Sequence, residues 1–164
     1  MYKKSIYDIP YEALKKKGIK CLIFDFDNTL VASTKSDWDK RLEKLMEKLE
    51  KEGFILLILS NNTQKRFEKF KKKFHIRVIS FGVKPLTIKF RKILKEYHLN
   101  KEEVAMIGDQ IFTDMLGANK VGIYTILVDP LEKKDLKITS VNRKLEQIIK
   151  KKYHWKEGQY FEKM

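Results

Sequence analysis

The chain has 164 residues, 43% of them hydrophobic, which is enough for one globular domain with a substantial core. Lysine and arginine total 36 against 22 aspartate and glutamate. The net charge of +14 either attracts polyanionic partners, such as nucleic acid, anionic lipid surfaces or phosphorylated substrates, or equally reflects many solvated helix faces. No apolar stretch is long enough to cross a bilayer and no secretory signal is present, so we expect a cytoplasmic protein without a transmembrane segment.

The first predicted strand carries the most informative residues of the chain. Residues 1–18 precede it as an N-terminal extension, with a short amphipathic stretch at 11–17. The apolar run 21–24 then predicts a strand buried on both faces, in which Cys21 is a small buried side chain rather than a reactive thiol. Asp25 and Asp27 follow this strand directly, at the end where open α/β sheets bind ligands.

This carboxylate pair has the composition that phosphoryl transfer needs. One aspartate can attack phosphorus and the other can protonate the leaving oxygen. Two carboxylates repel a phosphate dianion, so a divalent cation is required, and Mg²⁺ suits a site made only of oxygens. Two other interpretations are a pair of solvated turn acids and a calcium loop, but the latter needs Gly and Glu where Leu30 and Ser36 stand.

The next segment alternates between helical and strand patterns. Apolar residues spaced from Trp38 to Leu49 predict a helix that ends at Gly53, and 54–59 is a second apolar strand. Ser60 and Asn61 follow it at the start of a lysine-rich helix that begins near residue 64. Such side chains can donate to phosphate oxygens, although an ordinary helix cap is the alternative.

The second half repeats this alternation. A shorter strand is predicted at 77–80, then Lys84 and a helix that starts at Pro85 and runs to about Tyr97. Strand 104–107 leads into Gly108, Asp109 and, five residues later, Asp114. Strand 124–128 is the last, and residues 141–164 are assigned to a C-terminal helix and tail.

Five strands that alternate with helices predict one doubly wound α/β domain over residues 1–164, with a mostly parallel five-stranded sheet between two helical layers. The carboxyl ends of parallel strands share one edge. We therefore expect the four polar groups, which begin at Asp25, Ser60, Lys84 and Asp109, to converge there as an active site.

In number and order these groups resemble the motifs of the haloacid dehalogenase (HAD) superfamily of phosphohydrolases, which has a Rossmann-like fold. The first motif, Asp-x-Asp-x-Thr, is matched by residues 25–29, and the others by Ser60, by Lys84, and by Asp109 with Asp114. More narrowly, the motifs are similar to the YqeG group of subclass IIIA, which is related to phosphatidylglycerophosphate phosphatases. No insertion long enough for a substantial cap domain is present.

The resemblance implies a role for each residue. Asp25 would be the nucleophile, and Asp27 would be the general acid and then the base. Asp25, Asp109 and the main-chain carbonyl of Asp27 would bind Mg²⁺. The phosphoryl group would be held by Ser60, Asn61 and Lys84. Thr29 and Asp114 would support the other site residues.

The substrate is less specified than the chemistry. An open site and a basic surface suit phosphatidylglycerophosphate at an anionic membrane surface, to which the protein would bind peripherally. A nucleic-acid end, a phosphoprotein or a soluble phosphometabolite are the enzymatic alternatives. From other classes, a basic RNA-binding or scaffold module needs only the charge, and a receiver-like domain would need its phosphoacceptor where Lys84 stands.

Overall fold

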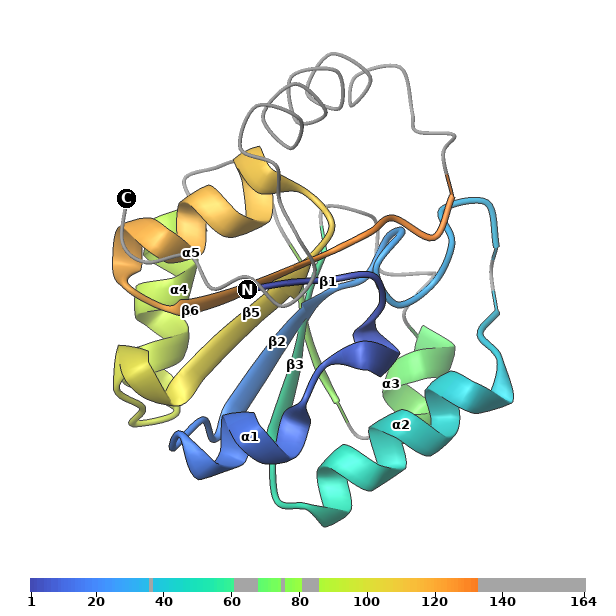
Figure 1. Cartoon of the computed structure of the whole chain (residues 1–164), viewed down its shortest axis with the longest axis horizontal. Coiled ribbons are helices and arrows are strands. Elements are labelled where there is room, and N and C mark those ends of the chain that lie inside the picture. The colour runs from blue at the N-terminus through green and yellow to red at the C-terminus, as the bar shows by residue number, and fades with distance from the viewer. Residues whose placement is uncertain (36, 61–67, 75, 81–85, 133–164) are drawn as a thin grey trace.

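The structure is a computed structural model and describes residues 1–35, 37–60, 68–74, 76–80 and 86–132. The strands form one parallel sheet in the order β1-β6-β5-β2-β3-β4 (Figure 1). Their bounds are β1 Tyr2–Lys3, β2 Cys21–Asp25, β3 Ile55–Ser60, β4 Arg77–Ser80, β5 Val104–Gly108 and β6 Tyr124–Val128.

Helices cover both faces of this sheet. Helices α1, α2 and α3 lie on one face, and α4 and α5 lie together on the other (Figure 1). The α-helices are α1 Tyr11–Lys16, α2 Lys40–Lys51, α3 Glu68–Phe74, α4 Leu86–Glu96 and α5 Leu116–Val121. Two 3₁₀ turns, η1 Ile6–Asp8 and η3 Lys101–Glu103, and a π-helical turn, η4 Ile111–Met115, complete the described elements.

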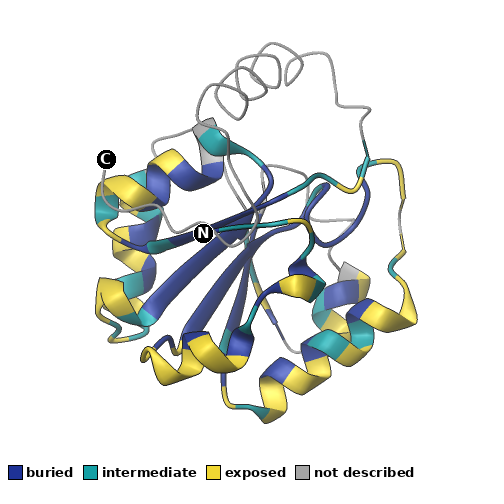
Figure 2. Cartoon of the chain, in the orientation of Figure 1, coloured by how far each residue is buried: buried dark blue, intermediate teal, exposed yellow. Residues whose placement is uncertain are grey.

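The two central strands are buried throughout, as their apolar sequences predict. Every residue of β2 and β5 is buried, and successive residues alternate between the two cores (Figure 2). Leu22 and Phe24 pack towards α1, α2 and α3, whereas Cys21 and Ile23 pack towards α4 and α5. A shift in the register of such a strand would move each side chain into the wrong core. The register is therefore fixed, and so is the position of the residues at the carboxyl end of the strand.

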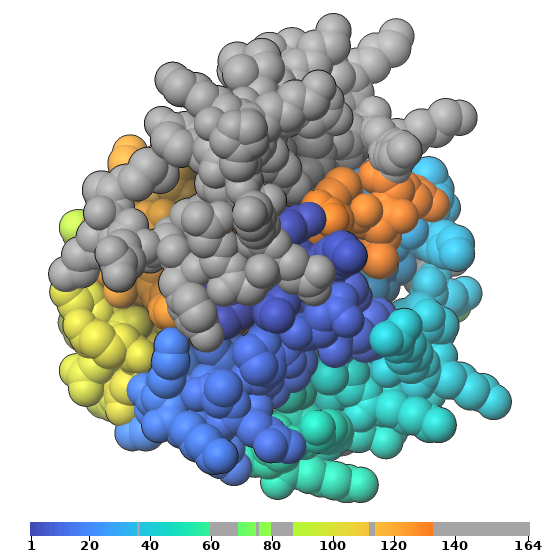
Figure 3. Space-filling view, in the orientation of Figure 1, coloured from blue at the N-terminus to red at the C-terminus, as the bar shows by residue number. Residues whose placement is uncertain are grey.

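The predicted doubly wound fold is confirmed, and the sheet has a sixth strand that the pattern analysis did not include. Residues 2–3 form β1 and pair with β6, and the backbone nitrogen of Met1 donates to the carbonyl of Thr125 at 2.9 Å. Figure 1 shows β1 beside β6, and in Figure 3 the dark-blue N-terminal segment lies next to the orange end of the described chain. A two-residue strand is too short for any alternation to be read.

The helix that the apolar spacing placed from Trp38 begins later, at Lys40. The side chain of Asp39 caps it by accepting a hydrogen bond from the Leu42 N–H at 2.8 Å. Trp38 instead packs edge-on against Phe70 of α3, with ring centroids 4.9 Å apart. The indole therefore connects the loop before α2 to α3. Trp38 is apolar because it packs against α3, and not because it is part of the α2 helix. The predicted starts of the next two helices, near residue 64 and at Pro85, lie outside the described residues.

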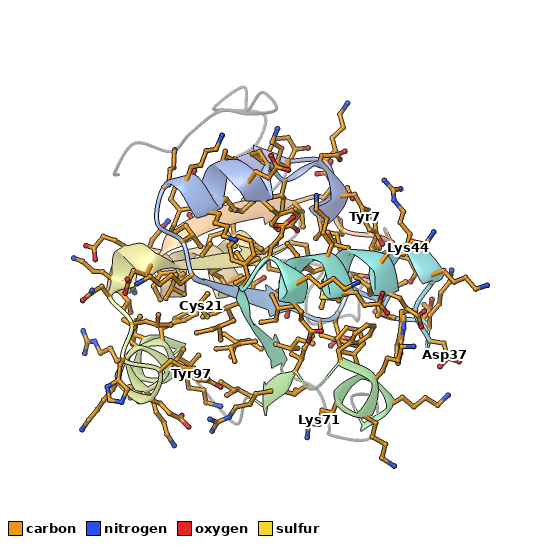
Figure 4. All side chains as sticks on the ribbon, turned by 90° about the horizontal axis from the view of Figure 1, so that it is seen from below. Tyr7, Cys21, Asp37, Lys44, Lys71 and Tyr97 are labelled. Carbon is orange, nitrogen blue, oxygen red and sulfur yellow. The ribbon has the colours of Figure 1, made fainter. Side chains whose placement is uncertain are left out.

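Cys21 provides a test of the buried strand. It lies in the interior (Figure 4), and burial raises the pKa of its thiol to about 12. Because the thiolate is the reactive form, iodoacetamide at about pH 8 should not label the folded protein, and should label it readily once urea returns the pKa to about 8.5. Mass spectrometry measures both. Fast labelling of the folded protein would contradict a closed core around β2.

Candidate active site

The site forms where the chain reverses direction across the sheet. From β2 the chain adds β3 and β4 on one side, then returns to place β5 on the other side of β2. This reversal makes the carboxyl ends of β2 and β5 a topological switch point, the place where open α/β sheets bind ligands. Asp25 is the last residue of β2, and Asp109 comes directly after β5. The two acids, which are 84 positions apart in sequence, therefore arrive side by side.

A third carboxylate completes the cluster. Asp25, Asp109 and Asp114 are all buried, and each offers one carboxylate oxygen such that all three oxygens lie within 4.8 Å of one another. Asp114 was predicted to have only a supporting role, whereas its carboxylate lies within the same 4.8 Å range as the other two. An oxygen-only cluster of this size fits a hard divalent cation.

The π-helical turn explains how Asp114 reaches the cluster. The N–H groups of Asp114 and Met115 both donate to the carbonyl of Gln110, at 3.1 and 3.3 Å, which widens the turn by one residue. The Gln110 N–H in turn donates to the Asp114 carboxylate at 3.1 Å. The spacing of five residues between Asp109 and Asp114 was visible in the sequence, but the wider turn was not.

Gly108 is the residue that makes room for Asp114. A Cβ atom built at position 108 would lie 2.4 Å from Oδ2 of Asp114 and 2.8 Å from its Cβ and Cγ. These distances are too short for any side chain, so only glycine allows Asp114 to fold back over the end of β5.

The loop after β2 holds Asp27 and Thr29. Asp27 is half-buried, and the backbone bends sharply at Asn28, whose φ of 63° is in the left-handed region that asparagine tolerates. The Asn28 side chain accepts a hydrogen bond from the Ser33 N–H at 3.1 Å, and Thr29 Oγ1 donates to the Asp109 carboxylate at 3.3 Å. Thr29 thus links the two halves of the site.

Two further contacts fix this loop from outside, and neither was anticipated from the sequence. The Leu131 N–H, beyond the end of β6, donates to the Asn28 carbonyl at 2.9 Å. Phe26, between the two aspartates, packs edge-on against Phe70 of α3 with centroids 5.6 Å apart. Their sequence signal is weak because each contact joins residues more than 40 positions apart.

The electrostatics of the cluster are unfavourable without a cation. Burial, followed by the negative charges of Asp114, Asp109 and Asp27, raises the pKa of the Asp25 carboxyl well above its usual value. Within the described part of the chain, Oδ2 of Asp25 is buried and has no hydrogen-bond partner. A buried carboxylate oxygen without a donor is costly, and a bound cation would satisfy it.

The remaining predicted site residues are only partly visible. Ser60 is the last residue of β3, one position beyond Leu59, which pairs with Asp25. Its backbone therefore lies at the same edge as the acids, while its side chain is not among those described. Asn61 and Lys84 lie outside the described residues.

Comparisons with known proteins find a relative by sequence and a similar fold among solved structures. The chain is 37% identical over 160 residues to a Bacillus subtilis (strain 168) protein named "Probable phosphatase YqeG", covering 94% of this chain and 93% of that protein. A solved haloacid dehalogenase-like family hydrolase from Xanthomonas campestris shares the fold, with a TM-score of 0.53 at 11% identity, over 84% of this chain and 94% of that one. The relative and the acidic cluster define a phosphatase, and its fold is the one seen in HAD-like hydrolases.

The family of the chain is also shown. A family model described as "Mitochondrial PGP phosphatase" matches residues 2–132, and the chain belongs to this family. An Arabidopsis thaliana protein named "Phosphatidylglycerophosphate phosphatase 1, chloroplastic/mitochondrial" is 28% identical over 139 residues, which are 79% of this chain. The match spans only 40% of the length of the plant protein.

Replacing Gly108 by Ala should displace Asp114 and so damage the acidic cluster. We expect a loss of about 1–3 kcal/mol of folding stability from the forced contact, and phosphatase activity reduced by about ten- to a hundred-fold through misplacement. Urea unfolding and phosphate release measure the two effects. Gly18→Ala is the control: its φ of +88° also strains alanine, but no atom lies within 4 Å of the added Cβ. If both variants kept full activity, close packing at Gly108 would not matter to the site.

Asp25→Asn should stabilise the protein in EDTA, because it removes one of three clustered negative charges. The melting temperature should rise by roughly 2–4 °C for each kcal/mol of repulsion relieved. Added Mg²⁺ should then raise the melting temperature of the native protein and not that of the variant. Asp37→Asn is the control, since that exposed acid pairs with Lys69 and lies outside the cluster. A variant less stable than the native protein in EDTA would show that the three acids do not repel one another.

Proposed function

We propose that this phosphatase hydrolyses phosphomonoesters in a Mg²⁺-dependent reaction that transfers the phosphoryl group to Asp25. The observation that carries the proposal is the buried cluster of Asp25, Asp109 and Asp114, in which one Asp25 oxygen has no hydrogen-bond partner among the described residues. Three buried carboxylates by themselves lower the stability of the fold. This loss of stability is explained if the acids bind a cation and take part in a reaction.

The metal ligands would be the carboxylates of Asp25 and Asp109 with the main-chain carbonyl of Asp27. Asp114 either joins them directly or holds them in place. The absence of nitrogen and sulfur from this set favours Mg²⁺ over zinc. When bound, Mg²⁺ would offset the negative charge of the acids and of the substrate phosphate, so that the two can approach.

In the first step, a carboxylate oxygen of Asp25 forms a bond to phosphorus as the bond from phosphorus to the leaving oxygen breaks. Asp27 donates its proton to that leaving oxygen. Asp27 then takes a proton from a water molecule, whose oxygen attacks phosphorus and releases inorganic phosphate and free Asp25. The half-buried position of Asp27 suits this role, because the group must exchange protons with water while Asp25 stays enclosed.

The phosphoryl oxygens would be held by Ser60, Asn61 and Lys84. Support for Ser60 comes from its position at the end of β3, the strand that pairs with β2. Asn61 and Lys84 are proposed from the sequence motifs alone. A hydroxyl, an amide and an ammonium would supply the donors and the positive charge that a transferring phosphoryl group needs.

The substrate we propose is the phosphomonoester of a glycerophospholipid, phosphatidylglycerophosphate. The family description and the plant relative support this choice. The loop between β2 and α2 supports it too. Among its described residues no helix or strand occurs beyond the single Asp27–Val31 bridge, so this loop contributes no cap that would exclude a large substrate.

A substrate panel tests both parts of the proposal. Phosphatidylglycerophosphate in mixed micelles, a 5′-phosphorylated oligonucleotide, a phosphopeptide and a sugar phosphate are each incubated with Mg²⁺ or EDTA, and released phosphate is measured. We expect release from the lipid, abolished by EDTA and by Asp25→Asn, and unaffected by Asp37→Asn. Release that survives Asp25→Asn would exclude Asp25 as the nucleophile, and preference for a soluble substrate would exclude the lipid.

A further inference from the structure

The described part of the chain exposes three large hydrophobic side chains: Ile88 is 61% exposed, Leu116 45% and Leu131 48%. Ile88 lies in the first turn of α4, Leu116 is the first residue of α5, and Leu131 lies three residues beyond β6. Scattered exposed hydrophobic residues are normal, but these three have a common location.

That location is the edge of the sheet that carries the acidic cluster. Helices that follow parallel strands begin at the carboxyl ends of those strands, so the starts of α4 and α5 lie at this edge. The two helices also pack side by side in the fold (Figure 1). Leu131 is placed there by its own N–H, which donates to Asn28 in the loop that carries Asp27.

The exposed side of α4 combines this apolar side chain with positive charge. Ile88, Arg91 and Lys92 are spaced at i, i+3 and i+4 and are all exposed, while Phe90 and Ile93 are buried against the sheet. Neither Arg91 nor Lys92 forms an ion pair with any residue that the structure describes. Figure 2 shows the outward side of α4 largely in the colour of exposed residues, so these two charges lie on the surface.

We propose that this edge docks onto an anionic lipid bilayer, with Ile88, Leu116 and Leu131 entering the headgroup region and Arg91 and Lys92 contacting lipid phosphates. Apolar side chains bordered by basic ones are the pattern that interfacial binding requires. The docking rests on the proposed lipid phosphatase function and places the acidic cluster against the surface from which its substrate projects. A helix that could span a bilayer is not found in the part of the chain that the structure describes.

Single-stranded RNA is the competing polyanion. It would use Arg91 and Lys92 but has no need of three exposed aliphatic side chains, since protein surfaces that bind single strands combine basic side chains with aromatic ones. The aliphatic residues therefore favour the bilayer.

The test is sedimentation of the full chain with phosphatidylcholine vesicles that contain or lack phosphatidylglycerol. Two double variants probe the surface: Arg91→Gln with Lys92→Gln, and Ile88→Ser with Leu116→Ser. The control is Lys16→Gln with Lys51→Gln, which removes the same charge from exposed lysines in the last turns of α1 and α2, at the opposite edge. Each probe variant should bind anionic vesicles at least about five-fold more weakly than the native protein, and the control should not.

Hydrolysis of p-nitrophenyl phosphate, a small soluble substrate, separates docking from catalysis. Both probe variants should keep native activity towards it and lose activity towards phosphatidylglycerophosphate in anionic vesicles. Three results would overturn the proposed docking surface. They are no binding of the native protein to anionic vesicles, equal vesicle binding by the probe variants and the control, and tighter binding to RNA than to vesicles. Absence of soluble-substrate activity with vesicle binding intact would instead overturn the phosphatase mechanism and leave the docking surface standing.

Discussion

The structure depends on the enforced proximity of like charges. Asp25 and Asp109 are held side by side because β2 and β5 pair directly in the middle of the sheet, and both strands are buried on both faces. The two hydrophobic cores stabilise this arrangement by far more than the repulsion between the acids costs. The three carboxylates therefore stay together in the folded protein. In an isolated loop they would move apart and be solvated by water.

A scaffold that holds repelling groups must also restrain the connecting loops. The turn after β2 is restrained on three sides: by Asn28 within the loop, by Leu131 from beyond β6, and by Phe26 against α3. Gly108 also determines the position of Asp114, because the lack of a side chain at residue 108 leaves room for the Asp114 carboxylate. The positions of the acidic side chains thus depend on four separate parts of the chain. The residues that make these contacts do not take part in the proposed reaction themselves.

Much of this was accessible from the sequence. The apolar runs before Asp25 and Asp109 predict buried strands, and parallel strands bring their carboxyl ends to one edge, so the convergence of these two acids follows from elementary rules. The equal standing of Asp114 did not follow, because it depends on a π-helical turn that no residue pattern marks. The two-residue strand β1 and the role of Trp38 were missed for a related reason: each is decided by a distant partner, β6 or Phe70, and not by neighbours in sequence.

The strand order also has a consequence for how the protein is made. Residues 2–3 cannot pair until residues 127–128 exist, and Asp25 has no acidic neighbour from β5 until residue 109 has been synthesised. A ribosome therefore delivers β2, β3 and β4 first, with the flank of β2 that will receive β5 still open. During that interval the nascent chain presents an unpaired apolar strand edge, the kind of surface that chaperones recognise and that aggregation exploits. Synthesis of the last third of the sheet is what ends this exposure.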